Sequence, residues 1–232
     1  MEAVERVFSD AADFVVRPLQ LGAVSAKACF IDGLTSGTQI AEFVLQPMTQ
    51  SLCGTAEEMV EQCLQGTVYS AVANAVTDLD TLCRKLVNGY CAVVFAGCPT
   101  AVVFEARTGE KRGPQPPQVE NTVKGPKDAF TETGRTNTSL VRRHLRTPDL
   151  RIWETTVGRR TLTNVSVVWI KGITDVHLVE RMKQRLQEIL CGVWRDTYKV
   201  CCRGFQDLRH HCRHGRGNGP HQIFQSFSPA LF

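Results

Sequence analysis

The sequence lacks the features that mark several common classes of protein. Glu2 and Glu5 stand where a secretory signal would carry cationic residues, and no apolar segment follows them. None of the ten cysteines forms a Cys-x-x-Cys pair, the spacing typical of zinc and redox sites. No nucleophile, histidine and carboxylate stand at a spacing that indicates catalysis. We therefore predict no catalytic residues, no metal site and no cofactor, and a protein that is not an enzyme.

Net charge is absent over most of the chain. The 232 residues carry a formal net charge of +4, and all of it falls in residues 190–232, so residues 1–189 are neutral overall. Nucleic-acid binding depends on neutralising phosphates, so a neutral body gives no reason to expect a nucleic-acid partner. The composition is otherwise that of a globular fold, with 43% hydrophobic and 22% charged residues.

One uncharged stretch, residues 86–104, is long enough to imitate a membrane helix. Gly97-Cys98-Pro99 interrupts it, and β-branched valines stand on both sides of this interruption. Two strands at 90–96 and 101–107, joined by a tight turn, explain the pattern better than a membrane span.

An internal repeat indicates how the chain is organised. The strand-like run that begins at Asp13 is echoed 136 residues later at Asp149, and Gly22 is echoed by Gly158 at the same offset. Residues 28–34 are then echoed by residues 167–173, at an offset of 139. Each copy is predicted to form two paired strands, a glycine turn and a helix.

The repeat predicts an α/β fold class, with two similar α/β subdomains from an internal duplication, the second incomplete. We expect a first subdomain at 1–112 and a Pro-rich linker at 113–124. A signature helix with a partial second subdomain follows at 125–189, and an atypical, poorly ordered tail rich in Arg, His and Cys at 190–232.

Local signals predict further elements. Thr55 and Glu58 form a capping box that begins a helix, residues 67–76 are strand-like, and Thr77 is predicted to cap the next helix. A helix over about 126–145 is predicted to bury Phe130, Val141 and Leu145. We expect Arg142 or Arg143 to lie near the other subdomain or near a cluster of carbonyl groups, and Asn137 to anchor neighbouring backbone.

Nine of the ten cysteines fall into two groups. Five lie in apolar periodic segments and are predicted to be buried and reduced: Cys29, Cys63, Cys83, Cys91 and Cys98. Four more lie in the tail beside four histidines, so zinc binding is one interpretation. The alternative, which we favour, is an out-of-frame extension, because Cys201 and Cys202 are adjacent and the composition changes abruptly.

The central run GPKDAFTETGRTNTSLVRR, residues 125–143, resembles the signature of the GerA-type spore germination receptor A subunits. The resemblance continues to about residue 189 and is looser over the first copy. It implies structural, ligand or partner contacts for the residues that match the signature: Gly125, Pro126, Phe130, Glu132, Arg135, Asn137, Arg142 and Arg143.

The resemblance also implies a location and partners. Such proteins lie in the spore inner membrane, where a soluble N-terminal region precedes a membrane domain. They act with B and C subunits to sense a small nutrient germinant. Stage V sporulation protein AF belongs to the same family.

Three departures from the family favour a truncated or frameshifted form, itself soluble: Gly134 replaces an apolar residue, the second copy lacks its closing hairpin, and no membrane domain is present. The alternative function is a soluble module that binds an anionic partner or nucleic acid through Arg142, Arg143 and the tail.

Overall fold

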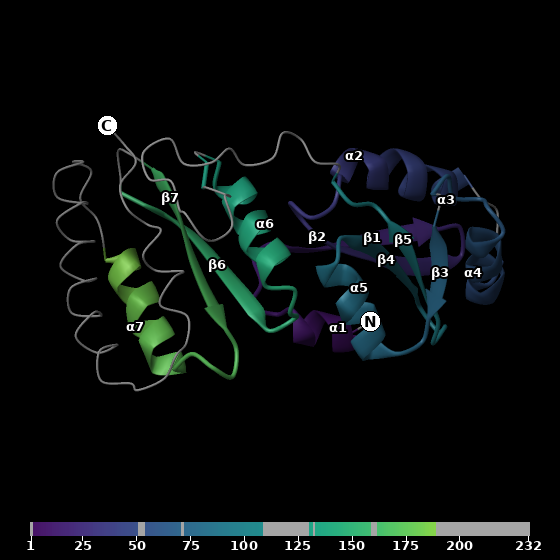
Figure 1. The fold of residues 1–232 in the computed structure, drawn as a ribbon. Helices are drawn as coiled ribbons and strands as arrows, with labels where there is room; N and C mark the ends of the chain where they lie inside the picture. The colour runs from purple at the N-terminus through teal and green to yellow at the C-terminus, as the bar shows by residue number, and fades with distance from the viewer. Residues whose placement is uncertain are drawn as a thin grey trace. The chain divides into compact units, whose positions relative to one another are not determined.

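A five-stranded antiparallel sheet organises the first half of the protein, in a computed structural model that describes residues 2–50, 54–70, 72–108, 130–131, 133–158 and 162–188. The strand order is β1-β2-β4-β5-β3, so the β1–β2 and β4–β5 hairpins lie side by side in the sheet (Figure 1). Its strands are β1 Phe14–Leu21, β2 Val24–Ile31, β3 Ala73–Val76, β4 Tyr90–Phe95 and β5 Ala101–Glu105.

Alternation along β4 supplies both faces of this sheet with apolar side chains. Cys91, Val93 and Phe95 join a core cluster on one face, and Ala92 and Val94 join a second cluster on the other. Every residue of β4 is buried. A strand covered on both faces is apolar throughout, and this explains why residues 86–104 imitate a membrane helix.

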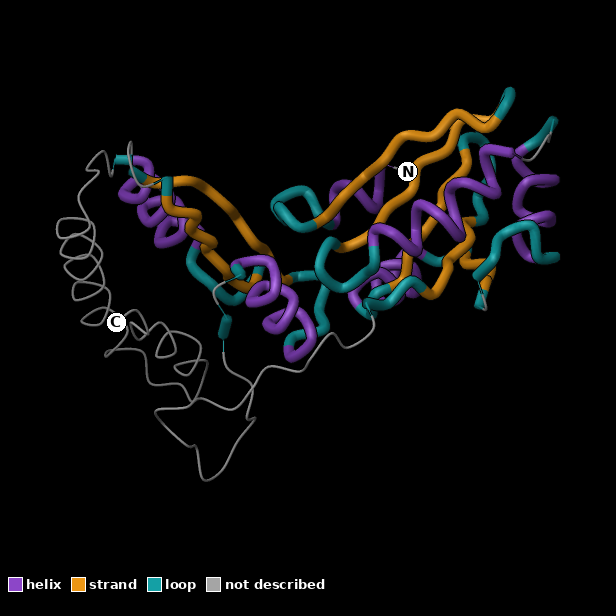
Figure 2. Tube along the Cα trace, turned by 90° about the horizontal axis from the view of Figure 1, so that it is seen from above, coloured by secondary structure: helices purple, strands orange, loops and turns teal. Residues whose placement is uncertain are grey.

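Helices cover both faces of the sheet (Figures 1 and 2). One face packs against α1 Glu2–Val7 and α5 Leu79–Val87. The other packs against a continuous helical segment and a separate helix: α2 Gly37–Gln39, the π-helix η1 Ile40–Leu45, α3 Gln46–Gln50 and α4 Ala56–Leu64. The first half is therefore a three-layer α/β structure.

The β4–β5 hairpin confirms the interpretation of residues 86–104 as paired strands. Val93 faces Val102 in the antiparallel register, and Cys91 faces Phe104. Within the part of the chain that the structure describes, no helix is long and apolar enough to cross a membrane.

Helix starts follow the sequence signals closely, with one correction. The capping box of α4 is present, since the Thr55 hydroxyl accepts from the Glu58 amide and Glu58 reaches back to the Thr55 amide. The cap of α5 is Asp78 and not Thr77, because the Asp78 carboxylate accepts from the amide of Thr81 at 2.8 Å. A carboxylate also stabilises the positive end of the helix dipole.

The predicted strand over 67–76 is shorter than expected. Only Ala73–Val76 pair with β5, and residues 67–70 leave α4 as irregular chain. Tyr69 instead donates its amide to the carbonyl of Phe43 in η1 at 3.0 Å. Local β-propensity in these residues is overridden by this contact.

A second group of elements follows in the chain: α6 Gly134–His144, β6 Leu150–Val157, β7 Thr163–Ile170 and α7 Val176–Gln187. Strands β6 and β7 form a two-stranded sheet. Lys183 of α7 lies over the rings of Trp153 and Trp169, at 6.0 and 5.0 Å, while Val179 is buried. The amide of Ala12 donates to the carbonyl of Ile152 at 2.7 Å, which ties β6 to the chain before β1.

The cysteines of the described residues behave as small apolar side chains. Cys29, Cys63, Cys83 and Cys91 are buried, as predicted, whereas Cys98, also predicted to be buried, is only half-buried. Burial raises the pKa of Cys29 and of Cys83 to about 11. The cysteines and histidines of the tail, and its predicted disorder, lie outside the described residues.

The helix predicted over 126–145 is shorter than expected. It begins at Gly134, after the N-cap residue Thr133, and Phe130 lies before it. Gly134 therefore occupies the first helical position, where the cost of a mid-helix glycine does not apply.

Its buried face also differs from the prediction. Leu140 and Arg142 are buried, whereas Val141 and Leu145 are only half-buried. Apolar spacing alone gave the wrong face because the deepest side chain of the helix is charged.

Candidate functional site: the arginine contacts of helix α6

The side chain of Asn137 fixes the chain that leads into α6. Asn137 accepts from the amide of Thr131 at 2.7 Å and donates to the carbonyl of the same residue at 2.7 Å. The two bonds close the chain before the helix into a loop, as the sequence analysis expected of Asn137. These bonds fix the orientation of the first turn of α6, and the arginines of the helix are positioned by that orientation.

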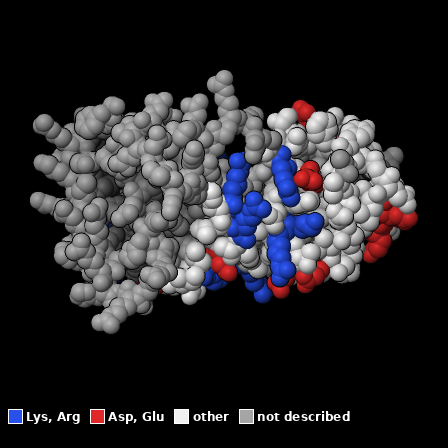
Figure 3. Space-filling model, viewed as in Figure 1, with Lys and Arg blue, Asp and Glu red and all other residues white. Residues whose placement is uncertain are grey.

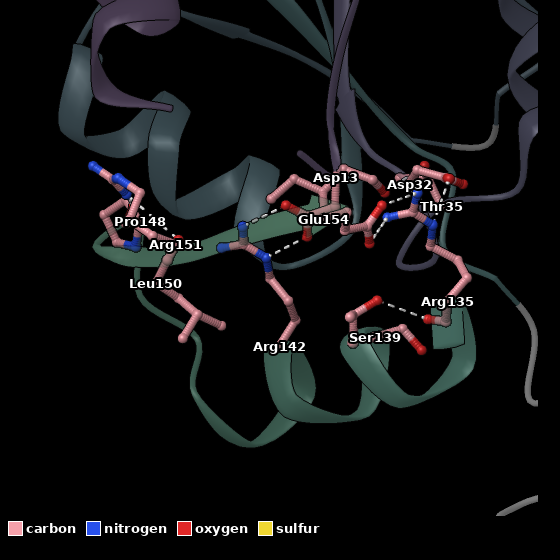
Figure 4. A network of polar contacts seen from close by, with 12 residues as sticks. Asp13, Asp32, Thr35, Arg135, Ser139, Arg142, Pro148, Leu150, Arg151 and Glu154 are labelled. Atoms are coloured by element: carbon pink, nitrogen blue, oxygen red, sulfur yellow. Dashed lines mark hydrogen bonds and ion pairs between the residues drawn. The ribbon is translucent and has the colours of Figure 1, made fainter. Parts of the chain in front are cut away.

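The central contact is a fully buried ion pair between Arg142 and Asp13, the residue before β1. Arg142 is 0% exposed and Asp13 1%. Nε donates to Oδ2 at 2.6 Å and Nη2 to Oδ1 at 2.7 Å, in the two-pronged geometry that guanidinium and carboxylate groups share (Figure 4). A charge buried this deeply is tolerated only with its partner, so the pair joins α6 to the first hairpin.

A second buried arginine, Arg151 of β6, binds carbonyls in place of a carboxylate. It donates to Pro148 at 2.5 Å and to Val7, the last residue of α1, at 2.7 Å. Burial lowers the pKa of Arg151 and the neighbouring Arg142 lowers it further, while Asp10 and Asp149 act in the opposite direction. The carbonyl at the end of α1 partly offsets the buried charge.

The third arginine, Arg135, lies at the surface. Its Nε is 3.0 Å from Asp32, which follows β2, and its two terminal nitrogens donate to the carboxylate of Glu154 in β6 at 3.2 Å each. These side chains are between about one-third and one-half exposed and are screened by water, so this network contributes less than the buried pair.

Close packing of backbone accompanies these charges. A Cβ built on Gly33, in the turn after β2, would lie 3.1 Å from Cβ of Ser139 in α6. Gly33 has a φ of +88°, which favours glycine for a second reason. The turn after β2 thus lies directly against α6, beside Ser139 and Arg135.

The structure places some of the signature residues and not others. Arg135, Asn137 and Arg142 each make one of the contacts described above. Phe130 is half-buried before the helix, and Arg143 is exposed. The others, Gly125, Pro126 and Glu132, lie outside the described residues. A band of Lys and Arg side chains crosses the face shown in Figure 3, with acidic groups beside it.

Sequence reasoning missed the partners of these arginines. Asp13 and Asp32 were recognised only as members of the repeat and of its looser family resemblance, and Glu154 was not singled out. Arg151 offered one signal, since it stands between Leu150 and Ile152 in an apolar run. A charged residue within such a run indicates a buried polar contact.

The three arginines of this site bind groups on other elements of the fold. No group of three metal-ligating side chains lies within the residues described. Two open cavities, of about 320 and 200 Å³, are lined by residues 3–101 and do not involve α6.

The same architecture is found in a protein of known structure. It is the fold of the N-terminal domain of the A subunit of the Bacillus megaterium spore germinant receptor GerK3, with a TM-score of 0.62 and 22% identity over 82% of this chain and 70% of that one. The chain belongs to the family described as Bacillus/Clostridium GerA spore germination protein, whose model matches residues 2–200.

Curated relatives of the chain carry matching descriptions. It is 28% identical to spore germination protein KA of Bacillus subtilis (strain 168) over 181 residues, which are 77% of this chain and 33% of that protein. It is 32% identical to stage V sporulation protein AF of the same strain over 133 residues, 57% of this chain and 27% of that protein. The chain spans about a third of the length of its curated relatives.

Proposed function

We propose that this chain is the extramembrane N-terminal region of a nutrient germinant receptor A subunit, in which α6 locks two α/β subdomains together. The observation that carries the proposal is the buried Arg142–Asp13 pair, which joins an arginine of the family signature to a residue 129 positions earlier in the chain. A receptor region that must transmit a signal needs a defined contact between its parts, and a two-pronged buried ion pair provides geometric specificity.

The two parts are proposed to be copies of one unit, with boundaries at 1–112 and 125–189 on either side of a linker. Their backbone contacts support this. The amide of Asp32 donates to the carbonyl of Asp13 at 2.8 Å, and the amide of Lys171 to that of Asp149 at 2.9 Å. The turns that follow also match, since Gly33 and Gly172 have φ values of +88° and +84°.

Hydrogen bonds within the two turns repeat in the same way. Leu34 and Thr35 donate to the carbonyl of Ile31 at 3.3 and 3.2 Å. The corresponding amides after β7 donate to the carbonyl of Ile170 at 3.3 and 3.0 Å. Each turn is followed by a helical segment, as the repeat predicted.

By this proposal the chain acts at the spore inner membrane with B and C subunits, in a response to a small nutrient germinant. Relatives that are named as germination proteins support this, whereas none supports the alternative of a module for nucleic acid or an anionic partner. The membrane anchorage, the germinant and the partner subunits are all parts of the proposal.

Germination of spores tests it. The gene is deleted in the spore former that carries it and restored as wild type, as Arg142→Met or as Arg143→Met, and optical density is followed with a panel of nutrients. We expect deletion and Arg142→Met to slow the response to at least one nutrient, while Arg143→Met, an exposed neighbour, restores it. Spores that respond alike in all four strains would refute the proposed function.

A further inference from the structure

The turn after β2 and the turn after β7 have the same backbone but different surroundings. The first turn is covered by α6: Gly33 lies against Ser139, and Leu34 is 7% exposed. Around the second turn, a Cβ built on Gly172 would meet no atom of the described residues within 4 Å, and Ile173 is 73% exposed. Val176, at the start of α7, is 68% exposed beside it.

Charged residues around the second turn repeat the first turn with one sign reversed. Asp13 accepts two hydrogen bonds from Arg142, and its counterpart is Asp149. Asp149 is an exposed carboxylate that lies 3.5 Å from the Thr147 hydroxyl. Asp32, which pairs with Arg135, corresponds to the exposed Lys171. A helix that packed on the second turn in the way that α6 packs on the first would therefore meet one acidic group, Asp149, and one basic group, Lys171.

The spacing of that helix follows from α6. Its contacts with Asp32, Gly33 and Asp13 come from residues 135, 139 and 142 in that order, and these three positions lie along one face of a helix. The residue over Lys171 would be acidic, the residue four positions later small, to fit against Gly172, and the residue three positions after that an arginine, to reach Asp149.

We propose that the surface formed by Asp149, Lys171, Gly172, Ile173 and Val176, the second-turn surface, docks a helix of a partner protein that carries this acidic, small and arginine pattern. The proposal rests on the duplication proposed above. A second copy of this chain does not fit, because its α6 would place Arg135 against Lys171 and is already seated on its own first turn. Apolar contact with Ile173 and Val176 supplies the attraction, and the charges select the partner.

Two matched peptides test the surface. One has the sequence of residues 130–146, and the other is the same peptide with Arg135→Glu. Each is titrated into the full chain while NMR follows the amides of Gly172 and Ile173. We expect the substituted peptide to shift these amides and to bind at least about tenfold more tightly than the native peptide, because like charges face each other in the native case.

A reciprocal substitution in the chain tests whether a difference in helical content between the two peptides explains their difference in affinity. In the chain with Lys171→Glu, an exposed position, the preference is expected to reverse, so that the native peptide binds more tightly. Circular dichroism checks that this variant is folded. Shifts at Gly33 in place of Gly172 would show displacement of α6 and would overturn the proposal.

The remaining outcomes also decide. If neither peptide binds either chain, or both peptides bind both chains equally, the second-turn surface does not select such a helix. If germination still depends on the gene, either of these binding results leaves the proposed receptor function intact. If germination does not depend on the gene, the receptor function is refuted whatever the peptides do.

Discussion

Replacing Arg142 with methionine removes the guanidinium that faces the buried carboxylate of Asp13 and leaves the volume of the side chain largely filled. Arg142 is 0% exposed and Asp13 1%, so water cannot replace the lost bonds of 2.6 and 2.7 Å. Removing one partner of a buried ion pair costs about 3–5 kcal/mol. A domain is stable by about 5–15 kcal/mol, so the substitution should remove a large fraction of the total.

Equilibrium unfolding in urea measures this cost, with Arg143→Met as the matched control on the same helix. The exposed control should change the free energy of unfolding by no more than about 0.5 kcal/mol. The double variant Asp13→Val with Arg142→Met should recover more than half of the loss, because it leaves no unpaired charge. Nη1 of Arg142 has no partner in the described residues, which makes the loss of the whole pair cheaper still.

The reasoning would be refuted by a loss below about 1 kcal/mol in Arg142→Met. It would also fail if the double variant were less stable than the single one. Either result would mean that the pair is not held in the buried geometry described here.

Three further substitutions or modifications follow from the structure. Gly33→Ala should be more destabilising than Gly172→Ala in thermal unfolding, because both strain a positive φ by about 1 kcal/mol but only the first also meets a Cβ at 3.1 Å; equal losses would contradict this. Iodoacetamide at pH 8 should label Cys98 faster than Cys29, as read by peptide mass spectrometry, because burial raises the pKa of the Cys29 thiol to about 11; equal labelling would show that Cys29 is accessible. Arg135→Ala should lower the free energy of unfolding by about 0.2–1 kcal/mol at low salt and less at high salt, and a loss that does not change with salt would argue against a screened ion pair.

Several elements followed from the sequence by itself because their causes are local. The capping box at Thr55, the β4–β5 hairpin and the strand pairs β1–β2 and β6–β7 depend on spacing and turn residues within a few positions. The burial of Cys29 and Cys91 follows equally from apolar alternation. The family signature also stood in the sequence, and its arginines were singled out there.

What those arginines bind was decided only by tertiary structure. Arg142 meets Asp13 across 129 residues, and Arg151 meets Val7 across 144. No periodicity encodes such a pairing, because periodic patterns record which side chains share a face and not which distant backbone that face meets. The buried face of α6 was mistaken for the same reason: an apolar pattern cannot rank a charged side chain as the most buried, since its burial depends on a partner supplied by the fold.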